Sequence, residues 1–233
     1  MKKFVRIRLD PSPAQAQRLA DLQAAFSLAC NTLAPIAAQS RCWNRVALHH
    51  LAYRDLRDAF PDLGSQMTCN AIYSVSRTCR VVYQHPKSPF NIASLGDKSL
   101  PRLHFTPKSP VYFDRHTLSI KDGQASMFTL DGRMRFHIEL TPEVERRFRT
   151  EKLREIVLTS NEDCFSLGFL FADPLIDQAA TKRGQLDEGF ETVSRHVQIV
   201  PSLAITPTIT TAVPAPMAAT AHAPAAAASH LTR

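Results

Sequence analysis

The middle of the chain, residues 101–171, is patterned as a series of β-strands. Apolar and polar residues alternate in three short runs, which are residues 111–113, 118–120 and 136–140. A period of two predicts half-buried strands. Asp122-Gly123 and Asp131-Gly132 lie between the runs, and Asp-Gly supplies the positive φ angles of a two-residue hairpin. We therefore expect an antiparallel meander that curls into a small β-barrel.

One strand and the first of three helices precede this region. Residues 3–9 alternate basic and apolar side chains, which predicts a strand with one basic face. Ser12 and Pro13 form a helix start, because serine caps a helix and proline suits its first position. Apolar residues at spacings of three and four predict a helix over residues 13–34. We expect Pro35 to bend or end it.

Two further helices are predicted before the strands. In the second helix, over residues 44–60, one apolar face is expected from five residues: Val46, Leu48, Leu51, Leu56 and Phe60. Ser65 is expected to cap the third helix, which runs to Tyr83 with Ser74, Arg77 and Arg80 facing outward. Residues 84–99 are predicted to form a loop, and residues 143–152 a short exposed helix.

The expected fold class is α+β, with a small antiparallel β-barrel and a three-helix insertion after the first strand. Residues 1–11 and 100–173 would form the barrel, and residues 12–99 the inserted helical lobe. Residues 174–200 have weak periodicity and are expected to be weakly ordered. Residues 201–233 are mostly Ala, Pro and Thr, a composition that cannot bury enough apolar surface to offset chain entropy, so we expect a disordered tail.

Positive charge is concentrated in the part of the chain that is predicted to fold. Residues 1–160 contain 24 Lys and Arg and 14 Asp and Glu, a formal net charge of +10, whereas residues 161–200 contain 3 and 7. A basic folded region suits a polyanionic partner such as nucleic acid. The alternative is that the basic balance only keeps the domain soluble, because no single Lys/Arg run locates a patch.

Metal, redox and membrane functions have little support in the sequence. The five cysteines form no C-x-x-C pair, and His49, His50 and His116 lack partners at ligand spacing, so we expect no metal site and no cofactor. An odd cysteine count without an apolar leader leads us to expect a reducing cytoplasm. No run reaches the ~18 apolar residues of a membrane span, so we expect no membrane partner.

Five short segments, in this order, resemble the N-terminal half of the transposon-encoded TnpB/OrfB family. The matching segments are residues 4–12, residues 24–33 with Cys30-Asn31, residues 51–57, residues 69–72 with Ser76-Arg77, and residues 113–120. The family consists of prokaryotic RNA-guided DNA nucleases related to type V CRISPR effectors. The resemblance covers about residues 1–173.

The resemblance implies a wedge-like barrel and a helical recognition lobe that grip a guide-type RNA and read a short DNA motif beside the target. A RuvC-like nuclease would follow in the family. Residues 174–233 contain no paired cysteines, and their Asp-x-Gly triplet, Asp187-Glu188-Gly189, lies in a polar stretch and not in a strand pattern. Asp173, Asp177 and Asp187 do not supply the converging carboxylates of a Mg²⁺ site. We therefore expect no catalytic residues and no cleavage by this chain alone.

Candidate RNA-binding residues are basic positions on the first strand and the third helix: Lys3, Arg6, Arg8, Arg77 and Arg80. The alternative for each is a solvated surface cation. Another basic segment, residues 146–152, alternates with glutamates and is interpreted as an exposed ion-paired helix. Large aromatic residues such as Tyr73 and Phe113 fit the core better than a base-stacking platform.

Candidate DNA-binding residues follow from motif position in the resemblance: Arg45, His49, Ser65, Cys69, Asn70, Asp114 and Arg115. Asn70 and Arg115 have side chains capable of bidentate base contacts. Cys69 and Asp114 match such a role poorly. For Asn70 the alternative is an ordinary helix-surface amide, and for Arg115 a solvated strand residue.

The leading hypothesis is a nuclease-lacking TnpB-like protein that binds guide-type RNA and flanking duplex DNA. A second hypothesis makes it the recognition subunit of a split nuclease, whose RuvC half is a partner chain. A third is a degenerate transposase remnant without activity. A cytoplasmic, nucleoid-associated location would fit the first two.

Overall fold

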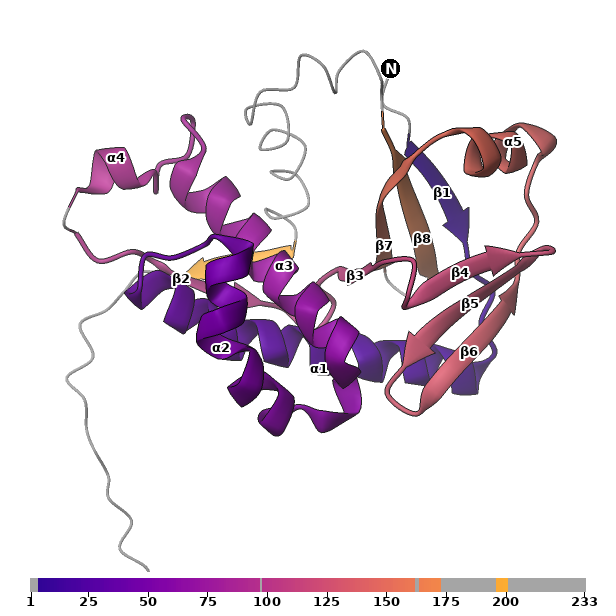
Figure 1. Cartoon of the computed structure of the whole chain (residues 1–233), viewed down its shortest axis with the longest axis horizontal. Coiled ribbons are helices and arrows are strands. Elements are labelled where there is room, and N and C mark those ends of the chain that lie inside the picture. The colour runs from indigo at the N-terminus through magenta and orange to yellow at the C-terminus, as the bar shows by residue number, and fades with distance from the viewer. Residues whose placement is uncertain (1–3, 97, 162–163, 173–195, 201–233) are drawn as a thin grey trace, which may run out of the picture. The chain divides into compact units, whose positions relative to one another are not determined.

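The computed structural model describes residues 4–96, 98–161, 164–172 and 196–200. It confirms the α+β class, with helices and antiparallel sheets (Figure 1). The predicted disordered tail lies outside the described residues, as do Lys3 and most of the segment predicted to be weakly ordered.

The largest sheet joins the start of the chain to its later strands. Its four antiparallel strands follow the order β1 (Phe4–Arg8), β8 (Cys164–Phe171), β7 (Leu153–Asn161) and β3 (Val111–Phe113). Helix α5 (Pro142–Thr150) confirms the predicted short helix and packs on this sheet. Its Phe148 ring lies edge-on to Phe169 and Phe171, with centroids 5.0 and 5.1 Å away.

The predicted meander forms a second sheet of β4 (Leu118–Lys121), β5 (Gln124–Thr129) and β6 (Gly132–His137). Asp122 and Gly123 form the first turn with φ angles of 49° and 71°, which confirms the predicted two-residue hairpin. In the second hairpin Thr129 pairs with Gly132, so the Asp-Gly dipeptide straddles the turn and the start of β6.

The predicted barrel is not confirmed, because the strands divide among three sheets and none of them closes within the described residues. Strand β2 (Arg102–Phe105) does not join the meander but pairs with β9 (Val197–Val200). The latter strand lies in residues 174–200, whose predicted weak order stays a prediction.

The first helix begins where its cap predicts, and the second begins one residue after its predicted start. In α1 (Pro13–Gln39) Ser12 accepts from the Gln15 backbone N–H and Gln15 returns a bond, which completes a capping box. Pro35 lies inside α1 and does not end it. A proline within a helix leaves one backbone carbonyl of the preceding turn without its N–H partner. Pro35 is exposed, so this carbonyl can bind water, whereas Leu33 and Ala37 on either side are buried. Helix α2 spans Arg45–Ala59, capped by Asn44.

The predicted apolar face of α2 is only partly right. Its buried residues are Leu48, Ala52 and Leu56, at a spacing of four. Val46 and Leu51 lie off that line and are 64% and 50% exposed. The core-facing stripe is therefore narrower than the apolar pattern of the sequence indicates.

The third helix is buried on most of its circumference. Helix α3 (Gly64–Gln84) continues directly from the 3₁₀ turn Pro61–Leu63, so Ser65 lies inside the helix and does not cap it. Thirteen of its 21 residues are buried. Ser74 is 3% exposed, so its predicted outward orientation is wrong. A short helix, α4 (Ile92–Leu95), lies in the predicted loop.

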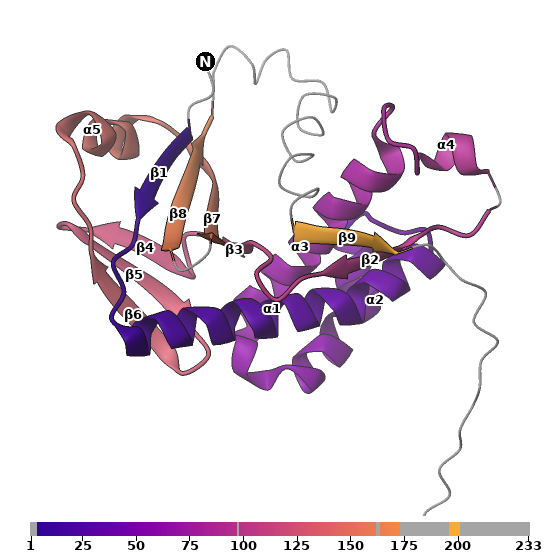
Figure 2. The same ribbon diagram turned by 180° about the vertical axis from the view of Figure 1, so that it is seen from behind.

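One hydrophobic cluster connects the helices with the strands. Helix α1 runs along the molecule from the meander to β2 (Figure 2). The Asn31 side chain of α1 donates to the Phe105 carbonyl at 2.9 Å and accepts from the Phe105 N–H at 2.7 Å, which ties α1 to β2. The division into a barrel and a helical lobe stays a prediction.

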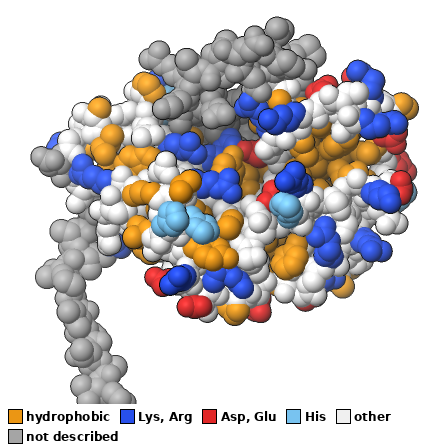
Figure 3. Space-filling view, viewed as in Figure 1, with side chains coloured by type: hydrophobic (Ala, Val, Ile, Leu, Met, Phe, Trp, Pro, Cys, Tyr) orange, Lys and Arg blue, Asp and Glu red, His pale blue; other side chains and the backbone are white. Residues whose placement is uncertain are grey.

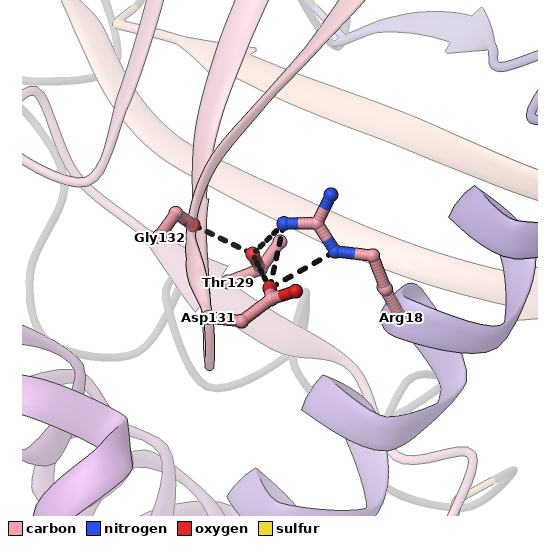
Figure 4. Close-up of polar contacts among 4 residues, drawn as sticks. All are labelled: Arg18, Thr129, Asp131 and Gly132. Carbon is pink, nitrogen blue, oxygen red and sulfur yellow. Dashed lines mark hydrogen bonds and ion pairs between the residues drawn. The ribbon is translucent and has the colours of Figure 1, made fainter.

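The second hairpin is joined to α1 by a polar network (Figure 4). Arg18 donates from Nε and Nη2 to one Asp131 carboxylate oxygen, at 2.9 and 2.6 Å, and from Nη2 to Thr129 Oγ1 at 3.0 Å. The Thr129 hydroxyl lies 2.8 Å from the same Asp131 oxygen. Hydrogen bonds from Arg18 and Thr129 lower the pKa of Asp131 below its ordinary 3.8.

We predict that Asp131→Asn destabilises the protein at neutral pH and that the difference disappears in acid. A carboxylate with a lowered folded-state pKa stabilises the fold above its unfolded pKa. That contribution is lost as pH falls through the folded pKa. Urea unfolding midpoints of both proteins, measured from about pH 7 to about pH 2, should converge at the acid end. A constant gap would contradict this role.

Candidate nucleic-acid interface

Strand β1 presents an open basic face. Arg6 and Arg8 alternate with the buried Val5 and Ile7, so both arginines are exposed as the sequence pattern predicts. Neither has a carboxylate partner within the residues that the structure describes. The predicted third member, Lys3, lies outside those residues.

An aromatic ring accompanies these arginines. Phe4 is 41% exposed, and the Arg6 guanidinium lies 5.8 Å from its ring centroid. The ring lies over Gly168 of β8, where an added Cβ would come within 2.5 Å of the ring. Glycine at this position therefore leaves room for the Phe4 ring over the sheet, beside the Arg6 guanidinium.

Arg77 was predicted to face outward and hold RNA phosphate, but the structure places it between α3 and β7. Its guanidinium forms an ion pair with Glu155 and donates to the Tyr73 hydroxyl at 3.3 Å. The Tyr73 hydroxyl itself donates to Glu155 at 2.9 Å. The Arg77 side chain is 17% exposed, so its predicted outward orientation is wrong and its charge is already neutralised.

Two tyrosines enclose this ion pair. Burial raises the pKa of Tyr73, and the neighbouring Glu155 charge raises it further. The Arg77 guanidinium lies 5.7 Å from the ring centroid of the buried Tyr112. Arg80, one turn further along α3, is half-buried and donates to the Ser76 carbonyl at 3.4 Å. Its predicted RNA contact stays a prediction.

Three of the predicted DNA-binding residues gather where α2, α3 and the turn after β3 meet. Arg45 is exposed at the first position of α2, with its guanidinium 5.5 Å from the Tyr73 ring centroid. Cys69 of α3 is half-buried, and burial raises the pKa of its thiol. The Arg45 charge opposes this rise in the Cys69 pKa and the Asp114 charge adds to it, so both charges act on the same thiol.

Asp114 has a local structural role. One of its carboxylate oxygens accepts from the backbone N–H groups of His116 and Thr117, at 2.9 and 3.0 Å, which holds the turn before β4. The other accepts from Gln66 of α3. A carboxylate with this many donors has little capacity left for a base edge.

The remaining predicted DNA-binding residues differ in exposure. Asn70 is 5% exposed and its amide faces Met67 Sδ at 3.8 Å, so its placement weighs against a base contact. Ser65 and Arg115 are exposed. His49 is half-buried and stacked on Tyr53, with centroids 4.4 Å apart. Their roles in DNA binding stay predictions.

Sequence reasoning did not single out the basic side chains on the outer face of the meander. Lys121, Arg133 and Arg135 line a hollow there. The available signal was the alternation of Arg133 and Arg135 with the apolar Met134 and Phe136, which places both arginines on one face of a strand. On the face seen in Figure 3, Lys and Arg side chains spread over helices and strands, while Asp and Glu lie mostly near the edge.

The described residues contain no cluster of three His, Cys, Asp or Glu side chains arranged to hold a metal ion. Among these same residues no helix has the length and hydropathy to span a membrane. No protein-family model and no curated protein matches the chain.

We predict that Glu155→Ala destabilises the fold by about 3 kcal/mol, because it leaves the Arg77 charge mostly buried and unpaired. The control is Glu145→Ala, which removes the exposed Arg149–Glu145 pair of α5 and should cost less than about 1 kcal/mol. Urea unfolding of the wild type and the two variants measures both changes in the free energy of unfolding. Equal effects would show that the Arg77–Glu155 pair is not a structural link.

Proposed function

We propose that this protein binds a polynucleotide, and RNA in particular, through the exposed face of β1. The observation that carries the proposal is the pair of exposed arginines, Arg6 and Arg8, that no carboxylate neutralises within the described chain. Arginine is well suited to phosphate, because its planar guanidinium donates two parallel hydrogen bonds.

The chemistry of the β1 face supports a single strand better than a duplex. Cations along an edge strand can follow a phosphate backbone, and an exposed aromatic ring offers a surface on which an unpaired base stacks. Phe4 and Arg6 supply both within one strand. A closed duplex would present only its phosphates to this ring.

A narrower proposal rests on the resemblance to the TnpB/OrfB family in residues 1–173. On that reading the bound polymer is a guide-type RNA. The surface around Arg45 and Arg115 would then contact flanking duplex DNA, and cleavage would require catalytic residues from elsewhere. Purifying the protein from its host and sequencing the RNA that accompanies it tests this reading. A uniform species encoded beside the gene supports it, and a random mixture contradicts it.

We predict that Arg6→Ala/Arg8→Ala weakens RNA binding and flattens its dependence on salt. Each phosphate contact to a single strand contributes about 0.7 to the slope of log affinity against log salt, so losing two should reduce that slope by about 1.4. Fluorescence anisotropy with a labelled single-stranded RNA measures the slope.

The control for this experiment is Arg146→Ala/Lys152→Ala, which removes the same charge from two exposed positions, one in α5 and one just after it. It should leave the slope near the wild-type value. If the wild-type protein itself binds with no salt dependence, phosphate contacts are absent and the proposed function is wrong.

We predict a different signature for Phe4→Ala. Loss of one stacked base should cost about 1–3 kcal/mol of binding free energy, whereas the salt slope should not change, because no charge is removed. Phe4→Tyr should retain the affinity, since it keeps the ring. A changed slope in Phe4→Ala, or unchanged affinity, would count against stacking at this position.

A further inference from the structure

The meander has two faces of opposite character. Its inner face buries Leu118, Met127 and Phe136 in the core. Its outer face carries polar and basic side chains around a hollow of about 580 Å³. We call this outer surface the meander face, and the residues that define it are Ser119, Lys121, Ser126, Arg133 and Arg135.

Strand pairing places these side chains in ordered rows. Ser119 pairs with Ser126, and Ser126 pairs with Arg135, so the three lie side by side across β4, β5 and β6. Arg133 and Arg135 are two residues apart on β6, which separates them by about 6.6–6.8 Å along the strand. That separation is comparable to the distance between neighbouring phosphates of an extended polynucleotide.

Arg133 is held in place without being neutralised. Its Nε donates to the Ser126 hydroxyl at 3.1 Å, one Nη donates to the Ser126 carbonyl at 3.1 Å, and the other to the His116 carbonyl at 3.2 Å. All three acceptors are uncharged. The guanidinium is therefore oriented by the sheet itself while its positive charge stays available.

The acid on the rim of the hollow is weakly engaged. The Asp122 carboxylate oxygen Oδ2 lies 3.9 Å from Lys121 Nζ, and the side chains of Lys121 and Asp122 are 86% and 85% exposed. An ion pair of this kind contributes little, because water screens both charges. Arg135 has no carboxylate partner among the residues described. Three cations thus face one acid across the meander face.

We infer that the meander face is a second phosphate-binding surface for the same RNA, an inference that rests on the proposed function. Arg133 would provide a fixed guanidinium, Arg135 and Lys121 mobile charges, and the Ser119 hydroxyl a neutral donor. Charge complementarity supports an anionic polymer as the occupant, because the hollow is open and its lining carries three cations and one acid.

The test compares three variants in the same anisotropy assay. Lys121→Ala/Arg135→Ala removes two cations from side chains that stabilise little else. The salt slope should fall by about 1.4, so that the affinity lost between about 50 and 200 mM salt is about sevenfold smaller than for the wild type. The charge-matched control is again Arg146→Ala/Lys152→Ala.

The third variant changes the charge in the opposite direction. Asp122→Asn removes the acid at the rim, and asparagine tolerates the left-handed backbone at this position. RNA binding should therefore become tighter at low salt and should approach the wild-type value at high salt. A decrease in affinity would overturn the inference.

The outcomes separate this inference from the proposed function. If the wild type binds RNA steeply with salt but Lys121→Ala/Arg135→Ala behaves like the α5 control, the meander face is not a phosphate surface and β1 remains one. If the wild type does not bind, the proposed function fails as well. Vesicles containing phosphatidylserine provide the remaining comparison: a loss of vesicle binding with unchanged RNA binding would assign the face to anionic lipid and overturn the inference.

Discussion

The ion pair between Arg77 and Glu155 is the interaction on which the arrangement of helices and strands depends. Helix α3 is enclosed by α1, α2 and β3, and the Arg77 side chain is mostly buried there, so its charge needs a partner within the protein. Glu155 of β7 provides it, and Tyr73 hydrogen-bonds both partners. This contact links α3 to the large sheet through β7.

The pairing of β1 with β8 sets the second constraint. Phe4 of β1 pairs with Leu170 of β8. The segment of the chain that forms the helices α1–α5 and the meander therefore leaves from one strand and returns to its neighbour in the same sheet. Strand β1 lies at the edge of its sheet, and edge strands in soluble proteins commonly carry charge that discourages pairing with other chains. Arg6 and Arg8 satisfy that requirement. The same exposure gives a bound polymer access to them, so the protective and binding roles are compatible.

Local signals in the sequence predicted most helices and strands, but they could not predict which distant residues come into contact. The Ser12 cap and the Asp122-Gly123 turn each depend on a few adjacent residues, and both are confirmed. Arg77 and Glu155 are 78 residues apart, and nothing near either residue marks it as half of a pair. The same reason explains β2: its alternation predicts a strand, but its partner β9 is set by tertiary packing.

Whether a carboxylate neutralises an arginine distinguishes structural arginines from candidate binding arginines more clearly than the position of the arginine in the sequence does. Arg18, Arg77 and Arg147 have carboxylate partners within reach, so moving them to a phosphate would require breaking a contact that stabilises the fold. Arg6 and Arg133 have none in the described part of the chain, and the latter is oriented only by uncharged acceptors. A phosphate could therefore approach either guanidinium without displacing an acid. The free energy of the phosphate–guanidinium contact would then contribute to binding and would not be offset by a lost ion pair.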